Sequence, residues 1–243
     1  MNKETVVKPW KHVLFFSVLL AAGLSAAGCA KTSDSSSAAE SDEPSISRSA
    51  ESTTAEPARP VTAAKANPGG GPFKTFPVYT DAKSPDNHYI PSGWMGDYGD
   101  IKFDDKAMDT PHGGSTSIKL VYSNNATQGA RWAGIYWQNP PNNWGTRPGG
   151  YDLTGAKKLT FWARGEKGGE RIEEFKMGGI NGEYSDSDSA GIGPVVLTPE
   201  WQQFTIDLEG KDLSSIIGGF CWATNLDVNP DGATFYLDDI RYE

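Results

Sequence analysis

The chain has 243 residues and a formal net charge of −9 at pH 7, with 31 acidic and 22 basic residues. This balance argues against nucleic acid and anionic lipid surfaces as partners, because both repel an acidic protein. We therefore expect no nucleic-acid binding.

Residues 1–28 have the pattern of a signal peptide. A basic leader precedes the apolar run 13–22, which is too short to span a bilayer core of about 30 Å. Residues 24–29, LSAAGC, resemble a bacterial lipobox, with Ala26 where that motif prefers Leu. The resemblance implies that Cys29 is diacylated and becomes the mature N-terminus. The alternative is an ordinary secretory cleavage nearby.

A lipid on Cys29 would supply the two acyl chains that stable membrane anchoring needs. We then expect an extracytoplasmic lipoprotein of the outer membrane or cell surface, with the membrane as one partner. Cys221 would be left without a disulfide partner, although the compartment is oxidising. Residues 29–71 are rich in Ser, Ala, Glu and Pro, which predicts a disordered linker because they bury too little apolar surface.

Residues 72–243 are of a size for one domain, which we expect to be monomeric. Short apolar runs separated by Gly, Pro, Asn and Asp predict strand after strand, with almost no helical periodicity. About ten strands without helices predict an all-β, two-sheet antiparallel sandwich of the jelly-roll type. The expected strands are 94–95, 100–104, 115–122, 131–137, 158–164, 172–177, 194–197, 202–208, 217–223 and 234–242.

The stretch 157–180 is predicted to be a hairpin with one apolar face. Leu159, Phe161 and Ala163 alternate with polar positions, glycines follow at 165, 168 and 169, and a second alternating run returns. The outer face would carry Trp162, Arg164, Glu174 and Lys176. A ring beside hydrogen-bonding charges suits a pyranose, whose apolar face stacks on the ring. The alternative is that a loop covers the Trp.

Three other stretches place rings where a ligand could meet them. In 131–137, RWAGIYW, we favour outward rings for Trp132 and Tyr136, which places Ala133 and Ile135 inward. The alternative is that the two rings lie in the core. Trp144, in a Pro- and Asn-rich loop, is either a lid over a ligand or a plug that caps the sandwich. Trp222 lies either on the binding face or in the core.

The motifs YDL (151–153), LTFWARG (159–165), GGE (168–170), EWQQFTIDL (200–208), GGFCWAT (218–224) and TFYLDDIRYE (234–243) resemble those of galactose-binding-like jelly rolls. They are similar in particular to carbohydrate-binding modules of family 11 and to the complex I intermediate-associated domain. The resemblance implies non-catalytic binding of a glycan or polysaccharide. The expected ligand residues are Trp132, Tyr136, Trp162, Arg164, Lys176 and Trp222. The competing interpretation is a structural or protein-interaction module of a cell-envelope assembly.

The same superfamily often holds a structural calcium ion through oxygen ligands. The matching residues here are Asp105 and Asp109, with Asp104 beside them, and Asp238 in the last motif. Their hard carboxylate oxygens are the donors that Ca²⁺ prefers. The alternative is a set of solvated loop carboxylates. The acidic loop 185–191, SDSDSAG, lacks calcium-loop spacing, and we expect it to be solvated.

We expect no enzyme activity, because the sequence has no HExxH, no GxSxG, no phosphate-binding glycine loop and no paired-cysteine metal motif. A glycoside hydrolase, the less favoured alternative, needs two carboxylates about 5 Å or about 6.5–9.5 Å apart. Glu174 and Glu183 are the best candidates for that pair.

Overall fold

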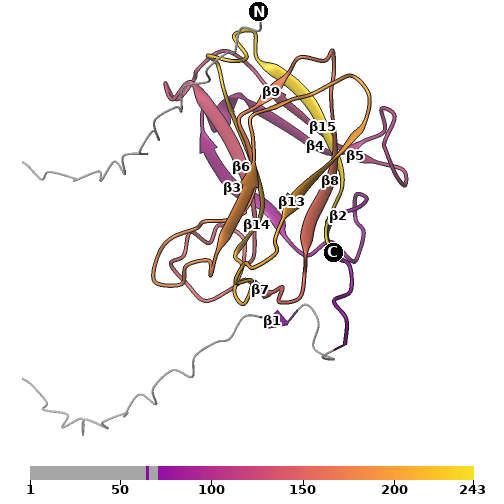
Figure 1. Cartoon of the computed structure of the whole chain (residues 1–243). Coiled ribbons are helices and arrows are strands. Elements are labelled where there is room, and N and C mark those ends of the chain that lie inside the picture. Colours follow the sequence, from indigo (N-terminus) through magenta and orange to yellow (C-terminus); the bar gives the residue numbers. More distant parts are fainter. Residues whose placement is uncertain (1–63, 66–70) are drawn as a thin grey trace, which may run out of the picture. The chain divides into compact units, whose positions relative to one another are not determined.

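A computed structural model describes residues 64–65 and 71–243 (Figure 1). The expected signal peptide 1–28 and the lipidation site Cys29 lie outside the described residues, as does most of the expected linker 29–71. The described residues fall within one compact unit. None of the helices among them is long and apolar enough to cross a membrane.

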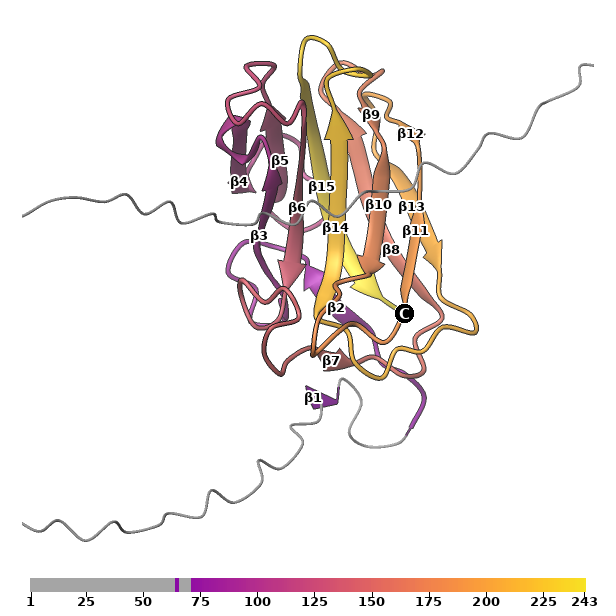
Figure 2. The same cartoon turned by 90° about the vertical axis from the view of Figure 1, so that its left-hand side faces the viewer.

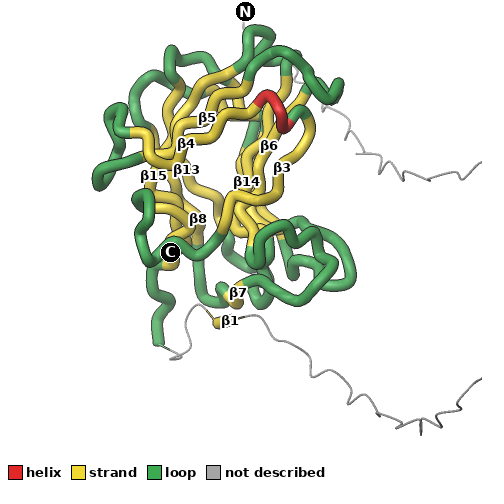
Figure 3. Tube along the Cα trace, turned by 180° about the vertical axis from the view of Figure 1, so that it is seen from behind, coloured by secondary structure: helices red, strands yellow, loops and turns green. Residues whose placement is uncertain are grey.

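Two antiparallel sheets face each other, with the core between them (Figures 1 and 3). The five-stranded sheet has the order β11 (Ser189–Ile192), β10 (Glu174–Gly178), β14 (Gly218–Asn225), β6 (Trp132–Gln138) and β3 (Ile90–Gly96). The six-stranded sheet has the order β13 (Gln202–Asp207), β8 (Lys158–Gly165), β15 (Ala233–Tyr242), β5 (Ser117–Tyr122) and β4 (Ile101–Ala107), and β2 (Phe76–Tyr79) also pairs with β15. The all-β sandwich predicted from the sequence is confirmed.

The smaller elements lie at the ends of these sheets. β12 (Val195–Val196) pairs with β9 (Arg171–Ile172), and η1 (Tyr98–Asp100) is the helical turn of the described chain. β1 (Ala64–Lys65) pairs in parallel with β7 (Tyr151–Asp152). Two residues of the expected linker therefore join the folded unit.

The core follows the period-2 alternation of the strands. Leu159, Phe161 and Ala163 of β8 are at most 1% exposed. Phe175 of β10 is fully buried, and its ring centroid lies 4.7 Å from that of Phe161. Because each fully buried ring or branched side chain contributes roughly 1.5–3 kcal/mol, this layer of side chains is the main force holding the two sheets together.

The predicted hairpin within 157–180 is wrong in its pairing. β8 pairs with β13 and β15, whereas β10 pairs with β11 and β14, so the two strands lie in opposite sheets. The glycine-containing segment between them passes from one sheet to the other. Alternation of apolar residues is the same for strands that pair edge to edge and for strands that face each other across a core, so the pattern alone does not distinguish the two.

Candidate functional site

The crossing between sheets divides the predicted ligand residues among three places. We call the solvent-facing side of the five-stranded sheet the five-stranded face, and that of the other sheet the six-stranded face. Figure 2 shows the five-stranded sheet in front, with β3, β6, β14, β10 and β11 side by side. Trp132, Tyr136 and Lys176 belong to the five-stranded face, Trp162 and Arg164 to the six-stranded face, and Trp222 to the core.

Trp222 is wrong as a ligand residue. Its side chain is 0% exposed, and its ring meets Phe235 of the opposite sheet edge to face at 5.0 Å. The small residues Cys221 and Ala223 take the outward positions of β14 instead. The two packings were equally compatible with the alternation, and the core takes the larger ring because it buries more apolar area.

Trp162 and Arg164 face outward as predicted, but other side chains of the protein cover them. The imidazole of His112 stacks on Trp162 with centroids 3.7 Å apart and planes 16° apart. The guanidinium carbon of Arg164 lies 3.7 Å from the ring centre of Tyr236 and 5.3 Å from that of Trp201. A loop therefore covers the Trp, which was the alternative to a sugar-binding role.

Hydrogen bonds to the main chain and to Glu166 hold the side chains of the six-stranded face in place. Arg164 donates to the main-chain oxygen of Asp109 at 3.0 Å, and Trp201 Nε1 donates to that of Thr110 at 2.9 Å. The Tyr236 hydroxyl donates to Glu166 Oε2 at 2.6 Å. Arg164 Nε is buried without a hydrogen-bond partner, but the other groups already have partners, so a ligand would have to break contacts to use them.

On the five-stranded face, strand register places the outward side chains in two rows. Met95, Gly134, Ala223 and Glu174 form one row across β3, β6, β14 and β10. The next row is Gly93, Tyr136, Cys221, Lys176 and Gly191. Residues opposite each other in register share one side of a sheet. Gly, Ala or Cys stands at five of these nine positions, so the face is shallow between the side chains of Met95, Tyr136, Glu174 and Lys176.

Gly134 is required where it stands. A Cβ on this residue would lie 2.5 Å from the Trp222 main-chain oxygen and 3.0 Å from the Met95 methyl group. The main chain of β14 and the Met95 side chain therefore lie very close to β6 at Gly134. The Met95 methyl group fills part of the space between the outward positions of Trp132 and Tyr136.

Exposed indoles stand at both ends of this low surface. Trp132, at the start of β6, is 39% exposed, and Trp144, in the loop after β6, is 40% exposed. The Trp144 ring meets that of Tyr136 edge to face at 5.9 Å. Because Tyr136 follows Trp132 by four residues on a strand, the two ends of the surface are about 13 Å apart along the strand.

Tyr136 is oriented as predicted but is only 4% exposed, so it is not a free stacking platform. Its hydroxyl donates to the Gly178 main-chain oxygen at 3.0 Å. Lys176 Nζ lies 5.5 Å from its ring centre. Burial, with the nearby Cys221 and Glu174, raises the pKa of Tyr136 well above its ordinary value. Tyr136 therefore supports Trp144 and Lys176 and stays neutral.

Lys176 supplies charge near the middle of the face. Its Nζ pairs with Glu174 Oε2 at 3.1 Å, and both side chains keep partial contact with solvent. Beside them lies a cleft of about 460 Å³, whose lining also includes Ser189, Gly191, Asp207 and Lys211. Ammonium, carboxylate and hydroxyl groups around a shallow cleft can donate to and accept from sugar hydroxyls.

The acidic loop 185–191 is not simply solvated. The Asp186 carboxylate accepts main-chain N–H groups of Ile180 at 2.8 Å and Gly218 at 3.2 Å, as well as that of Ile217. Asp188 accepts the Asp212 N–H at 3.1 Å and pairs with Lys211 at 3.2 Å. The loop therefore holds one end of the five-stranded face in place.

The three expected calcium ligands do not form a calcium cage. In the described part of the chain, no three His, Cys, Asp or Glu side chains are arranged to hold a metal ion. The Asp238 carboxylate accepts the N–H groups of His112, Gly113 and Asp239 at 2.8–3.1 Å. Asp109 pairs with Lys119 at 3.5 Å, and Asp105 accepts the Tyr79 hydroxyl through its main-chain oxygen. Calcium binding stays a prediction.

The sequence did not predict several residues of the five-stranded face, or did not decide on which face they lie. Trp144 could not be assigned a face from periodicity, because it lies in a loop. Met95 gave no signal in a short, glycine-containing strand. Ser189 and Gly191 lie in β11, a strand that had been expected to be loop, and the pairing of β11 with β10 brings them to the cleft.

No family model matches the sequence, and no curated protein matches it either. Several solved carbohydrate-binding modules are similar to it in structure. The family 30 module of the cellulosomal cellulase Cel9D-Cel44B of Clostridium thermocellum is 17% identical with a TM-score of 0.47, covering 70% of this chain and 97% of that one. The family 11 module of Lic26A-Cel5E from the same organism is 13% identical with a TM-score of 0.42, covering 71% and 95%.

A family 29 module that was solved with cellulohexaose is 9% identical with a TM-score of 0.40, covering 70% of this chain and 89% of that one. The resemblance to carbohydrate-binding modules expected from the motifs is thus confirmed as a structural similarity, family 11 included. At these identities and TM-scores, the similarity assigns no ligand and no ligand residue to this chain.

Proposed function

We propose that the five-stranded face binds a glycan chain without cleaving it. The observation that carries this proposal is the pair of exposed indoles, Trp132 and Trp144, at opposite ends of a low surface of small residues. An indole left in solvent offers a flat apolar platform, and the apolar face of a pyranose is its natural complement. The separation of the two rings favours a chain of several sugars over a single one.

The polar groups between the rings would fix the hydroxyls of the chain. Lys176 and Glu174 are paired with each other, so the middle of the face is locally balanced in charge. A neutral sugar could be bound there by exchanging hydrogen bonds, without leaving an unpaired buried charge. Each stacked ring contributes about 0.5–1.5 kcal/mol beyond burial, so we expect affinities in the micromolar-to-millimolar range.

Anchoring through a lipid on Cys29 belongs to the same proposal. Many weakly binding copies tethered to one membrane engage a polymer at several points, and the effective affinity then rises by orders of magnitude. The acidic composition is compatible with an extracytoplasmic location. Metabolic labelling with a fatty acid, compared between the chain and its Cys29→Ser variant, tests the anchor directly.

The test of glycan binding is a titration of the full chain with a panel of soluble polysaccharides, followed by tryptophan fluorescence and calorimetry. We expect saturable binding to at least one polymer, with loss of affinity in Trp132→Ala and in Trp144→Ala at unchanged melting temperature. Trp162→Ala is the matched control, because that ring lies on the six-stranded face. Binding that is unaffected by both substitutions, or no binding to any polymer, would overturn the proposal.

The competing function is a protein-interaction module that uses the same rings. It predicts that a partner captured by the full chain stays bound after exhaustive deglycosylation and is lost in the Trp132→Ala variant. Release of the partner by deglycosylation supports glycan binding instead.

A further inference from the structure

Two polar side chains are fully buried beside the exposed indoles of Trp132 and Trp144. Asp97 and Gln138 are both 0% exposed. Burying a polar group costs free energy unless the group is hydrogen-bonded, so the hydrogen-bond partners of these two side chains show what each one holds in place. In both cases the partners are main-chain groups next to an exposed tryptophan.

Asp97 fixes the main chain that leads into Trp132. Its carboxylate accepts the N–H groups of Gln128, Ala130 and Arg131 at 2.6–3.0 Å. The Asp97 N–H donates to the Trp132 main-chain oxygen at 2.7 Å. Arg131 has a φ of 60°, which is uncommon for a residue with a side chain. The hydrogen bonds to Asp97 hold the chain in this conformation, so Trp132 begins from a fixed position.

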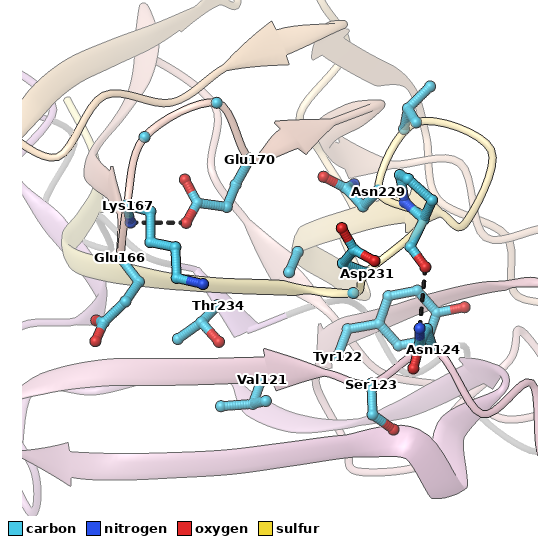
Figure 4. Close-up of a pocket in the computed structure, with 16 residues that line it drawn as sticks. Val121, Tyr122, Ser123, Asn124, Glu166, Lys167, Glu170, Asn229, Asp231 and Thr234 are labelled. Carbon is cyan, nitrogen blue, oxygen red and sulfur yellow. Dashed lines mark hydrogen bonds between the residues drawn. The ribbon is translucent and has the colours of Figure 1, made fainter.

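The indole of Trp132 is also supported from two sides. It packs on Gly96, where a Cβ would lie 3.0 Å from Trp132 Cδ2. The loop after β14 lies on the other side, and its Leu226 N–H donates at 2.9 Å to the main-chain oxygen of the residue before Trp132. That loop is itself tied down, because Asn124 Nδ2 donates to the Pro230 main-chain oxygen at 3.0 Å (Figure 4).

Gln138 holds the loop that carries Trp144. Its Nε2 donates to the Asn143 main-chain oxygen at 3.0 Å, and its Oε1 accepts the Ser92 hydroxyl at 3.0 Å. Ser92 Oγ in turn accepts the Asn142 N–H at 2.9 Å. The two residues before Trp144 are therefore bonded to side chains of β6 and β3.

The loop is also fixed after Trp144. The Gly145 main-chain oxygen accepts the Tyr184 N–H at 3.0 Å, and Asn143 Nδ2 donates to the Arg147 main-chain oxygen at 2.9 Å. Surface loops are usually more mobile than the strands that they connect. Here the main chain is held on both sides of an indole that stays 40% exposed. A ring that is held in its binding position loses little conformational entropy when it stacks on a ligand.

We propose that Gln138 is a positioning residue that fixes Trp144, so that the two indoles stand at a set spacing on the five-stranded face. This inference rests on the function proposed above and narrows the ligand class. The rings are about 13 Å apart along the strand, so the preferred ligand is a glycan chain long enough to reach both. A single sugar meets only one ring.

The first test needs no ligand. The full chain is labelled with 5-fluorotryptophan, and the ¹⁹F resonances of Trp132 and Trp144 are assigned by substituting each with Phe. We expect Gln138→Met to shift and sharpen the Trp144 resonance and to leave that of Trp132 in place, because only one loop is released. Ser92→Ala is a milder change in the same network and should act in the same direction. Gln203 is exposed on β13, so Gln203→Met is the matched control and should move neither resonance.

The second test is calorimetry with glucan, mannan and xylan oligosaccharides of increasing length, starting from the monosaccharide. We expect affinity to rise at least about fivefold once the chain reaches the second ring, because each stacked ring contributes about 1 kcal/mol. Gln138→Met should remove this rise, as should Trp144→Ala. In the Trp144→Ala background, Gln138→Met should weaken binding by less than about twofold, because the ring that it positions is already gone.

The outcomes separate this inference from the function on which it rests. An unchanged Trp144 resonance in both Gln138→Met and Ser92→Ala would overturn the positioning role, whatever the glycan result. Losses of affinity that multiply in the double variant would overturn it too. A rise with chain length that survives Trp144→Ala would overturn the ligand class and leave glycan binding intact. Absence of binding to every glycan would overturn the proposed function, while the ¹⁹F spectra would still decide what Gln138 holds.

Discussion

The two outer faces of the sandwich are built from similar residues and differ in what those residues touch. The six-stranded face has Trp162, Trp201, Tyr236 and Arg164, and each meets another side chain or a loop of the same protein. On the five-stranded face, Trp132 and Trp144 keep 39% and 40% of their surface in solvent. Aromatic residues near charges therefore do not indicate a binding surface by themselves. Ring surface that stays exposed to solvent does indicate one.

The core tryptophan gives the largest contrast with either face. We expect Trp222→Ala to lower the free energy of unfolding by about 3–5 kcal/mol, because the cavity left in a packed core adds to the lost burial. Urea denaturation of the chain measures this. Trp132→Ala is the matched control and should change stability by less than about 1 kcal/mol. A small loss for Trp222→Ala would mean that its ring is not sealed between the sheets.

The double substitution Trp132→Ala with Trp144→Ala tests the five-stranded face most strongly. If each ring contributes about 1 kcal/mol and the rings are far enough apart to act independently, glycan affinity should fall about 30-fold. Fluorescence is compromised by the loss of two indoles, so calorimetry is the measurement. A loss no larger than that of one single variant would mean that only one ring meets the ligand.

Trp162→Ala tests the six-stranded face in the opposite sense. Removing the ring leaves His112 without its stacking partner, so we expect a loss of about 1–2 kcal/mol in stability. Glycan affinity should be unchanged in calorimetry. Reduced affinity at full stability would reverse the assignment of the two faces.

The pH dependence of stability reports on the loop that covers the six-stranded face. Burial raises the pKa of Asp238 from 3.8 to about 6, although the N–H groups of Gly113, Asp239 and His112 oppose the rise. The folded state therefore binds this proton more tightly than the unfolded state does. The stabilisation is complete below pH 3.8 and is lost as the pH rises through about 6.

We expect the contribution of Asp238 to unfolding free energy to increase by about 1 kcal/mol from pH 8 to pH 5. Asp81, Asp188 and Asp212, whose pKa values are lowered by hydrogen bonds, act in the opposite direction but only at lower pH. Denaturation across that window, compared between the chain and Asp238→Asn, isolates the effect. If the unfolding free energy changes with pH by the same amount in both proteins, the pH dependence comes from other groups.

Calcium should have the smallest effect. No three carboxylates among the described residues are arranged around one point, so we expect the predicted calcium ion to bind weakly and to shift the melting temperature, relative to a chelator, by less than about 2 °C. An ion at 100 times its dissociation constant would stabilise the fold by about 2.7 kcal/mol. A shift of several degrees would therefore indicate a tightly bound ion, and no shift at all would contradict the calcium prediction.

The sequence by itself determined the local features of this protein. Alternation in β6 and β8 gave the inward residues correctly, including Ala133, Ile135, Leu159 and Phe161, because side-chain direction in a strand depends only on parity. The scarcity of helical periodicity gave the all-β class. These properties depend on residues that are close together in the sequence, so they can be predicted without knowing the contacts between distant residues.

Only the tertiary structure decided which strands are partners and which rings stay in solvent. The sequence pattern predicts β8 and β10 as neighbours, but they lie in opposite sheets, so Trp162 and Lys176 are on opposite faces and not on one surface. Parity also did not decide whether Trp222 faces solvent or the core, and in the structure its side chain is buried in the core. Pairing and covering depend on contacts between residues far apart in the chain, such as His112 on Trp162, and a local pattern carries no information about them.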